Sequence, residues 1–185
     1  MIIFLTGYPQ VGKTTLCELV KKHNSMRIVD VTSPIHHHVF AHYNITDPKL
    51  QFNLLTGMKD MPFWCFGDRT FRDECIRMGS FMGDRYWMDN VVFKFLEEPS
   101  VPLLASSVKN VWQIEYVAKR VNLPITDMKI CSIHRPGYHK SDNCRETLPA
   151  DFSLCNEGIP EELHQKFIIK INELVQPECE QRRSD

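Results

Sequence analysis

The fold is decided by the stretch Gly7-Tyr8-Pro9-Gln10-Val11-Gly12-Lys13-Thr14, which matches the phosphate-loop pattern Gly-x4-Gly-Lys-[Ser/Thr]. An apolar run at residues 1–6, which predicts a buried strand, comes before it. Residues 13–23 follow with apolar side chains at helical spacing. A chance match is expected in about 1% of chains of this length, and the strand-loop-helix order makes it rarer. The stretch therefore indicates a nucleotide-phosphate site.

Each residue type in this loop has a chemical reason. Glycines let the backbone curl so that N–H groups point at phosphate oxygens, and the following helix presents its positive end to the same anion. We expect the Lys13 ammonium to reach the β- and γ-phosphates of ATP and the Thr14 hydroxyl to bind Mg²⁺. The predicted cofactor-binding residues are Gly7, Gly12, Lys13, Thr14 and Thr15.

Length and composition set the frame around the loop. The chain has 185 residues, 43% hydrophobic and 24% charged, which is typical of a globular protein. We predict a single domain over residues 1–175 and a solvated tail over residues 176–185. A net charge of −1 predicts no stable nucleic-acid binding, and the apolar opening run is too short to anchor the chain in a membrane.

The seven cysteines are scattered and include no Cys-x-x-Cys pair. This pattern favours neither a disulfide framework nor a zinc site. We therefore expect the reducing cytoplasm, that of the host cell if the chain is viral.

Strand and helix patterns alternate along the rest of the chain. Strands are predicted at residues 27–31, 103–105, 128–133 and 152–155, and helices at residues 34–43, 68–82, 85–97, 111–121 and 160–175. Such alternation predicts an α/β fold, with a mainly parallel β-sheet flanked by helices on both faces. Residues 44–67 have no clean periodicity and are interpreted as a partly helical flap. This flap belongs to a helical substrate-binding region over residues 34–97, and residues 135–149 are predicted to form a lid.

Cationic side chains gather in three segments beyond the phosphate loop. Arg69, Arg72 and Arg77 share one predicted helix. Asp84-Arg85-Tyr86-Trp87 opens the next helix, and His134-Arg135-Pro136-Gly137 follows the fourth strand. Because guanidinium groups bind phosphate in a bidentate manner, these segments are candidates for a second phosphate site.

In order and spacing these segments resemble a known family, the bacteriophage deoxynucleoside monophosphate kinases, within the adenylate-kinase-like P-loop proteins. The resemblance covers nearly the whole chain. Its blocks are residues 7–14, Ser33-Pro34-Ile35, Arg72 seven residues before Gly79, Asp84-Arg85 with Trp87, Arg135-Pro136-Gly137, Asn156-Glu157-Gly158 and Glu161-Glu162-Leu163. The resemblance implies transfer of the γ-phosphoryl group of ATP to a deoxynucleoside 5′-monophosphate. It also implies that two copies can form a homodimer.

The resemblance further implies roles for single residues. Arg72 and Arg85 are similar to the clamp on the acceptor phosphate, Trp87 to a neighbouring packing or base-contacting residue, and Arg135 to the start of the lid. The expected catalytic residues are thus Lys13, Arg72, Arg85 and Arg135. The expected substrate-binding residues are Arg72, Arg85, Trp87, His36 and Lys109, and the lid residues His139, Lys140 and Arg145 would exclude water from the reaction.

The chain departs from the family after the third strand. Where the family has Asp-x-Arg, this chain reads Ser107-Val108-Lys109, so an acid expected to support Mg²⁺ is absent. Asp30 and Asp84 are the substitutes that the sequence offers. His36, His37, His38 and His42 are interpreted as surface histidines near an anionic substrate rather than metal ligands, because no third convergent ligand is evident.

Two alternatives stay open. A hydroxyl acceptor needs a general base, whereas a phosphate monoester is largely a dianion at neutral pH and needs none. The abundance of arginine and the lack of a convincing catalytic carboxylate favour the phosphate acceptor. A P-loop kinase of another small metabolite or of a polynucleotide 5′ end is the first alternative. A catalytically degenerate nucleotide-binding protein, suggested by Ser107, is the second.

Overall fold

The computed structural model describes residues 1–8, 10–23, 26–137 and 148–175, apart from the side chains of Asp84 and Val175. Its centre is a five-stranded sheet in which every pair of neighbours is parallel. In order across the sheet, the strands are β2 (Arg27–Asp30), β3 (Leu103–Ser106), β1 (Ile2–Thr6), β4 (Met128–His134) and β5 (Phe152–Cys155). The predicted parallel α/β architecture is confirmed.

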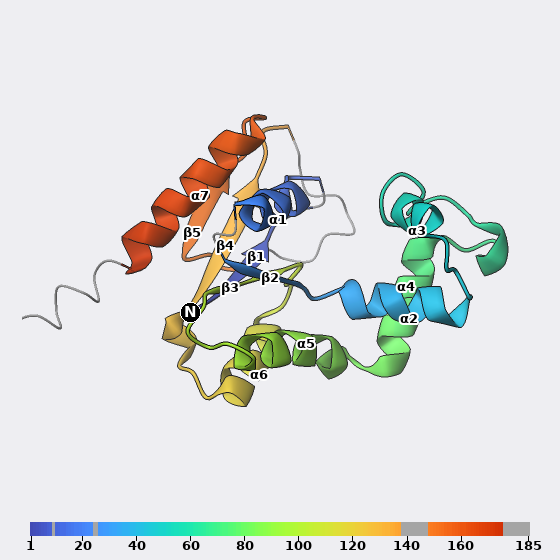
Figure 1. Ribbon diagram of the computed structural model, residues 1–185, viewed down its shortest axis with the longest axis horizontal. Helices are drawn as coiled ribbons and strands as arrows, with labels where there is room; N and C mark the ends of the chain where they lie inside the picture. The colour runs from blue at the N-terminus through green and yellow to red at the C-terminus, as the bar shows by residue number, and fades with distance from the viewer. Residues whose placement is uncertain (9, 24–25, 138–147, 176–185) are drawn as a thin grey trace, which may run out of the picture.

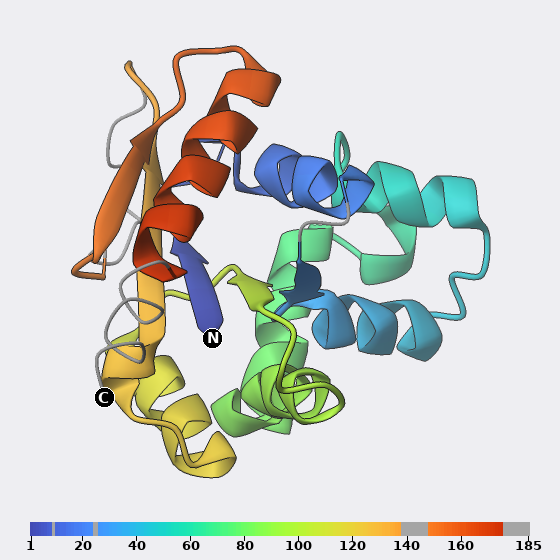
Figure 2. The same cartoon turned by 60° about the vertical axis from the view of Figure 1, so that its left-hand side comes forward.

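Helices cover both faces of the sheet (Figures 1 and 2). Strand β1 is buried throughout, and alternate side chains point to opposite faces. Ile3 and Leu5 pack in the cluster beneath α1 (Lys13–Lys22) and α7 (Pro160–Val175). Ile2 and Phe4 pack in the cluster beneath α5 (Asp84–Leu96) and α6 (Val111–Val121), with the short η2 turn (Ile125–Asp127) after α6.

The segment between β2 and α5 forms a helical region beside the sheet (Figures 1 and 2). It consists of α2 (Ser33–His42), α3 (Pro48–Leu55), the 3₁₀ turn η1 (Trp64–Phe66) and α4 (Phe71–Met82). This region has a small core of its own, made of Val39, Phe40, Ile45, Leu54, Phe63, Phe66 and Phe71. The prediction of a partly helical segment over residues 44–67 agrees with α3 and η1.

Predicted boundaries differ from the observed ones by no more than one residue, except at the start of one helix. The helix predicted from residue 68 begins at Phe71, because the Thr70 hydroxyl accepts from the Asp73 amide at 3.1 Å while the Asp73 carboxylate accepts from the Thr70 amide at 2.8 Å. The strand predicted to reach residue 31 ends at Asp30.

Two predicted segments lie mostly or wholly outside the residues that the structure describes. The greater part of the expected lid, residues 138–147, and the tail at residues 176–185 are not among the described residues. Among the described helices, none has the length and apolar character needed to cross a membrane.

The topology places the candidate site. Parallel strands bring their carboxyl ends to one edge of the sheet, where α/β proteins bind ligands. The segments after β1, β2, β3 and β4 therefore meet there, beginning at Gly7, Val31, Ser107 and Arg135.

Candidate active site

The phosphate loop is shaped by backbone that only glycine tolerates. Gly7 and Gly12 have φ angles of 131° and 107°. A Cβ atom at Gly7 would lie 2.3 Å from the carbonyl oxygen of Ile133, and one at Gly12 would lie 2.4 Å from Nδ2 of Asn156. Both positions therefore exclude a side chain by conformation and by space.

Lys13 stands at the start of α1 and turns back over the loop. Its Nζ donates hydrogen bonds to the carbonyl oxygens of Gly7 at 2.7 Å and Tyr8 at 2.6 Å. The ammonium is thus held directly above the curl of backbone that the motif predicts for phosphate, in reach of an anion that enters it.

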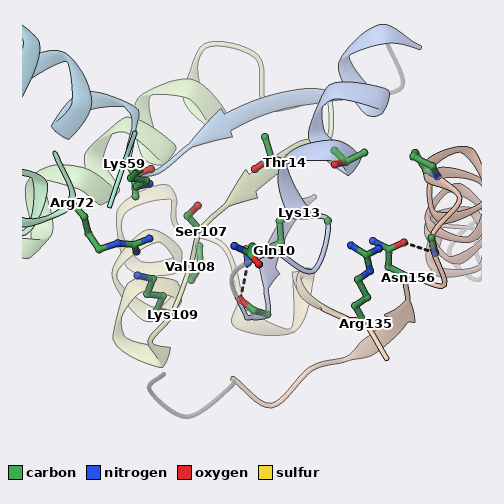
Figure 3. Close-up of a pocket in the computed structure, with 16 residues that line it drawn as sticks. Gln10, Lys13, Thr14, Lys59, Arg72, Ser107, Val108, Lys109, Arg135 and Asn156 are labelled. Atoms are coloured by element: carbon green, nitrogen blue, oxygen red, sulfur yellow. Dashed lines mark hydrogen bonds between the residues drawn. The ribbon is translucent and has the colours of Figure 1, made fainter. Parts of the chain in front are cut away.

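A pocket of about 460 Å³ opens in front of this loop (Figure 3). Five cationic side chains line it, and none of the described residues in its wall is Asp or Glu. The cations are Lys13, Lys59, Arg72, Lys109 and Arg135; the other lining residues are Gly7, Gln10, Gly12, Thr14, Thr15, Thr32, Ser107, Val108, Asn156, Gly158 and Pro160. Such a wall attracts a polyanion.

The cations divide between two ends of the pocket (Figure 3). Lys59, Arg72 and Lys109 lie toward one end, which we call the acceptor end. Arg135 and Asn156 lie toward the other, which we call the donor end, and Lys13 and Thr14 lie between the two groups. Cationic side chains are therefore present on both sides of the phosphate loop.

Asn156 connects the donor end to the phosphate loop. It is buried, its Nδ2 donates to the carbonyl of Val11 at 2.8 Å, and its Oδ1 accepts from the amide of Gly158 at 3.2 Å. One side chain therefore fixes both the loop and the turn between β5 and α7. Sequence reasoning quoted this residue within a block but gave it no role in the site.

At the acceptor end, Arg72 is oriented by Asp60. Arg72 donates to the two carboxylate oxygens of Asp60 through Nε and through Nη2, the latter at 3.0 Å. The hydrogen bond from Arg72 and its positive charge hold the pKa of Asp60 below its usual value. The amide of Arg72 also donates to the carbonyl of Lys59 at 3.1 Å. Lys59 was missed from sequence because the segment around it has no periodic pattern.

Arg69 and Arg77, the other two arginines of this segment, pair with a buried carboxylate. Glu74 is fully buried and forms ion pairs with Arg69 and with Arg77, the latter at 2.8 Å, while the Tyr43 hydroxyl donates to it at 2.8 Å. Burial alone would raise the pKa of Glu74, but the hydrogen bonds from Arg77 and Tyr43 and the two positive charges lower it. Of the three arginines, only Arg72 is among the residues that line the pocket.

Several predicted site residues lie elsewhere in this conformation. Arg85 is exposed at the start of α5 and is not among the pocket-lining residues. Trp87 is 6% exposed and packs in the core beneath α5 and α6. His36 lies against Phe71, with ring centroids 5.6 Å apart. The lid residues His139, Lys140 and Arg145 lie outside the described part of the chain.

The pKa of His36 lies well below its usual value. Burial lowers its pKa from 6.5 to about 4, and the charges of Lys59 and His37 act in the same direction against that of Asp30. The imidazole is therefore neutral at pH 7. In the described part of the chain, no three His, Cys, Asp or Glu side chains gather as metal ligands.

The loop residues fit Mg²⁺ that arrives with a nucleotide. Mg²⁺ prefers oxygen ligands and keeps several waters, so one protein hydroxyl beside phosphate oxygens is a suitable donor set. Thr14 lines the pocket and would supply that hydroxyl. Asp30, one of the two substitutes for the missing acid, ends β2; its Oδ1 accepts from the amide and hydroxyl of Thr32 at 3.0 and 2.9 Å and from the Ser106 hydroxyl at 3.3 Å.

Fold and loop together define an α/β P-loop NTPase fold with a cationic pocket at the phosphate loop. No family model matches the chain, and a search of curated proteins finds no match. Among solved structures, a "putative kinase" from Chloroflexus aurantiacus is similar with a TM-score of 0.52, at 10% identity over 93% of this chain and 96% of that one.

Two further structures are similar at lower scores. Shikimate kinase from Aquifex aeolicus has a TM-score of 0.47 at 16% identity, covering 94% of this chain and 97% of its own. The APS kinase of Mycobacterium tuberculosis has a TM-score of 0.43 at 13% identity, covering 92% and 96%. At such identities the likeness concerns the fold alone, so the activity has to be argued from the pocket.

Proposed function

We propose that this chain is a phosphotransferase that moves the γ-phosphoryl group of ATP to the phosphate of a nucleoside or deoxynucleoside 5′-monophosphate. One observation carries the proposal. The acceptor end of the pocket presents Lys59, Arg72 and Lys109, and the described wall of the pocket includes no carboxylate. Such an end suits an acceptor that is itself an anion.

The chemistry of the acceptor agrees with this wall. A phosphate monoester has its second pKa near 6 and is largely a dianionic nucleophile at neutral pH, so it requires no general base. Two polyanions must instead be held end to end against their repulsion, which is the work of arginine and lysine. Lys13, between the two ends, would neutralise the charge that develops on the transferring group.

The remaining residues would position the two ligands. The loop amides and Lys13 would hold the ATP phosphates, with Lys13 exchanging its bonds to Gly7 and Tyr8 for phosphate oxygens. Mg²⁺, held by Thr14 and phosphate oxygens, would supply charge neutralisation. Arg135 and the turn fixed by Asn156 would receive the rest of the nucleotide at the donor end.

Asp30 supports a second candidate, a kinase of an alcohol acceptor. Its carboxylate lies at the carboxyl end of β2, beside Thr32 of the pocket wall, and Thr32 and Ser106 both bind one of its oxygens. A carboxylate at that edge of the sheet is placed as a general base would be. It ranks second because Asp30 itself is not among the lining residues.

Turnover measurements separate the candidates. The protein is assayed for ADP release with ATP and Mg²⁺ against each common ribo- and deoxyribonucleoside 5′-monophosphate, the corresponding nucleosides, and an oligonucleotide with a 5′-hydroxyl end. We expect turnover with one or more monophosphates and none with the nucleosides. Turnover only with hydroxyl acceptors would favour the second candidate, and ATP binding without turnover would favour a binding protein.

A further inference from the structure

The end of the flap, residues 57–67, is held by backbone contacts against residues 69–72, where α4 begins. Pro62 and Thr70 form an antiparallel bridge, and the amide of Phe63 donates to the carbonyl of Arg69 at 3.3 Å. The amide of Arg72 then donates to the carbonyl of Lys59 at 3.1 Å. These bonds set the main chain of Lys59 against that of Arg72.

The side chain of Lys59 is directed to the pocket and is not neutralised there. It is half-buried and lines the pocket, and within the described residues its ammonium has no hydrogen-bond or ion-pair partner. Its charge lowers the pKa of His36, Asp60 and Cys75. Asp60, the acid next to it in sequence, is engaged by Arg72.

The geometry of Arg72 leaves donors for a second anion. A guanidinium group has five N–H donors in a planar fork. Asp60 takes one from Nε and one from Nη2, which leaves both donors of Nη1 and the second of Nη2. Asp60 thus fixes the plane of the fork and leaves donors free. Lys59, Arg72 and Asp60 together carry two positive charges and one negative charge.

From this imbalance we infer that Lys59 and Arg72 together form a two-cation clamp for the phosphate of the acceptor, with Asp60 as the positioning residue of the Arg72 fork. The inference rests on the proposed function and adds to it the flap residue that completes the phosphate site. Arg72 supplies a directed fork and Lys59 a compact charge on a flexible stem, so the two can grip different oxygens of one phosphate.

The first test compares two lysines of the helical region. Lys59→Met removes the charge and keeps the stem, and Lys49→Met makes the same change at an exposed lysine of α3 that is not among the pocket-lining residues. We expect Lys59→Met to raise the KM for the monophosphate by at least about tenfold, the range for a lost charge-assisted contact, and to leave the KM for ATP within about twofold. Lys49→Met should change neither value, and Lys59→Arg should recover most of the loss.

A second measurement separates this inference from the proposed function. The protein is loaded with Mg²⁺ and a non-hydrolysable ATP analogue, and its unfolding temperature is followed as inorganic phosphate is added. We expect phosphate to stabilise the unmodified protein and Lys49→Met, and to stabilise Lys59→Met only at about tenfold higher concentration.

The outcomes are distinct. Monophosphate turnover with an unchanged KM in Lys59→Met would overturn the clamp and leave the proposed function standing. Phosphate binding that depends on Lys59 in a protein that transfers nothing to any monophosphate would support the clamp and overturn the proposed function.

Discussion

The phosphate loop and the acceptor end of the pocket are built in different ways. Between the donor and acceptor ends, the phosphate loop is one run of chain, residues 7–15, and its shape follows from backbone conformation at Gly7 and Gly12. The acceptor end takes Lys59 from the flap, Arg72 from α4 and Lys109 from the segment after β3. A site made of backbone can be recognised from local sequence, whereas a site made of distant side chains depends on how the elements pack.

The hydrophobic cores behind the phosphate loop and behind the acceptor end also differ. The loop grows out of β1, which lies between two layers of helices and is buried along its whole length. The acceptor end rests on the helical region, whose core is small and aromatic, with Phe40 and Phe71 stacked at 5.2 Å. The acceptor end therefore has less buried apolar surface behind it and is the more sensitive of the two to single changes.

The largest effect is expected at the loop. Lys13→Ala should reduce phosphoryl transfer on the order of a thousandfold, because the ammonium neutralises charge that develops in the transition state. Steady-state turnover measures this, and calorimetric titration with the monophosphate should show that the acceptor end still binds. Near-normal turnover in a folded Lys13→Ala variant would contradict the proposed function.

The next effect concerns the stability of the helical region in acid. The folded pKa of His36, about 4, is below its usual 6.5, so the unfolded chain binds the proton more readily between these values. The stability present above pH 6.5 is therefore lost as pH falls toward 4, by roughly 3 kcal/mol. Urea unfolding of His36→Gln at several pH values should show a flatter acid slope than that of the unmodified protein.

His37→Gln is the matched control for that experiment. His37 is the exposed neighbour of His36, so His37→Gln removes an exposed imidazole and leaves that of His36 in place. The acid slope should remain in this variant. Equal slopes in His36→Gln and the unmodified protein would mean that His36 accepts a proton in the folded state as readily as in the unfolded chain.

A moderate effect should distinguish the two arginines that resemblance placed in one clamp. Arg72→Ala should lower kcat/KM for the monophosphate by about 2 kcal/mol, or roughly thirtyfold, while ATP affinity changes little. Arg85→Ala should change either value by less than about threefold, since Arg85 is exposed and is not among the residues of the pocket wall. Equal losses from both variants would indicate that Arg85 reaches the acceptor in another conformation.

What the sequence could and could not predict follows from the same comparison. Strand order along the chain, the α/β class and the phosphate loop all depend on local pattern, and the structure agrees with each. Helical spacing alone did not separate Arg69, Arg72 and Arg77, and only the family resemblance singled out Arg72. In the structure Arg69 and Arg77 pair with Glu74, and Arg72 lines the pocket. Helical spacing describes the faces of a helix without saying which neighbour each face meets.

Lys59 and Asn156 show two further limits. The bridge between Pro62 and Thr70 holds the segment that carries Lys59 at the pocket, and no hydrophobic periodicity in the sequence predicts that contact. Asn156 reaches the carbonyl of Val11 across 145 positions of sequence. The one sequence signal for Asn156 was its place directly after a predicted strand, where polar residues of parallel sheets meet at the ligand-binding edge.

The smallest expected effect tests whether the missing acid belongs to the donor or the acceptor side. Ser107 has a φ of 70°, a left-handed conformation that aspartate adopts more readily than most residues, so Ser107→Asp should fold normally. If Ser107 faces bound Mg²⁺, the new carboxylate can accept from metal-bound water and lower the Mg²⁺ concentration for half-maximal rate by about two- to fivefold. Ser107→Gly relieves the backbone without adding charge and should leave that concentration unchanged. If Ser107→Asp instead raises the KM for the monophosphate at an unchanged Mg²⁺ requirement, the new charge lies beside Lys109 and repels the acceptor. That result would assign the end of β3 to the acceptor side and leave Asp30 and Asp84 as the candidate acids for the metal.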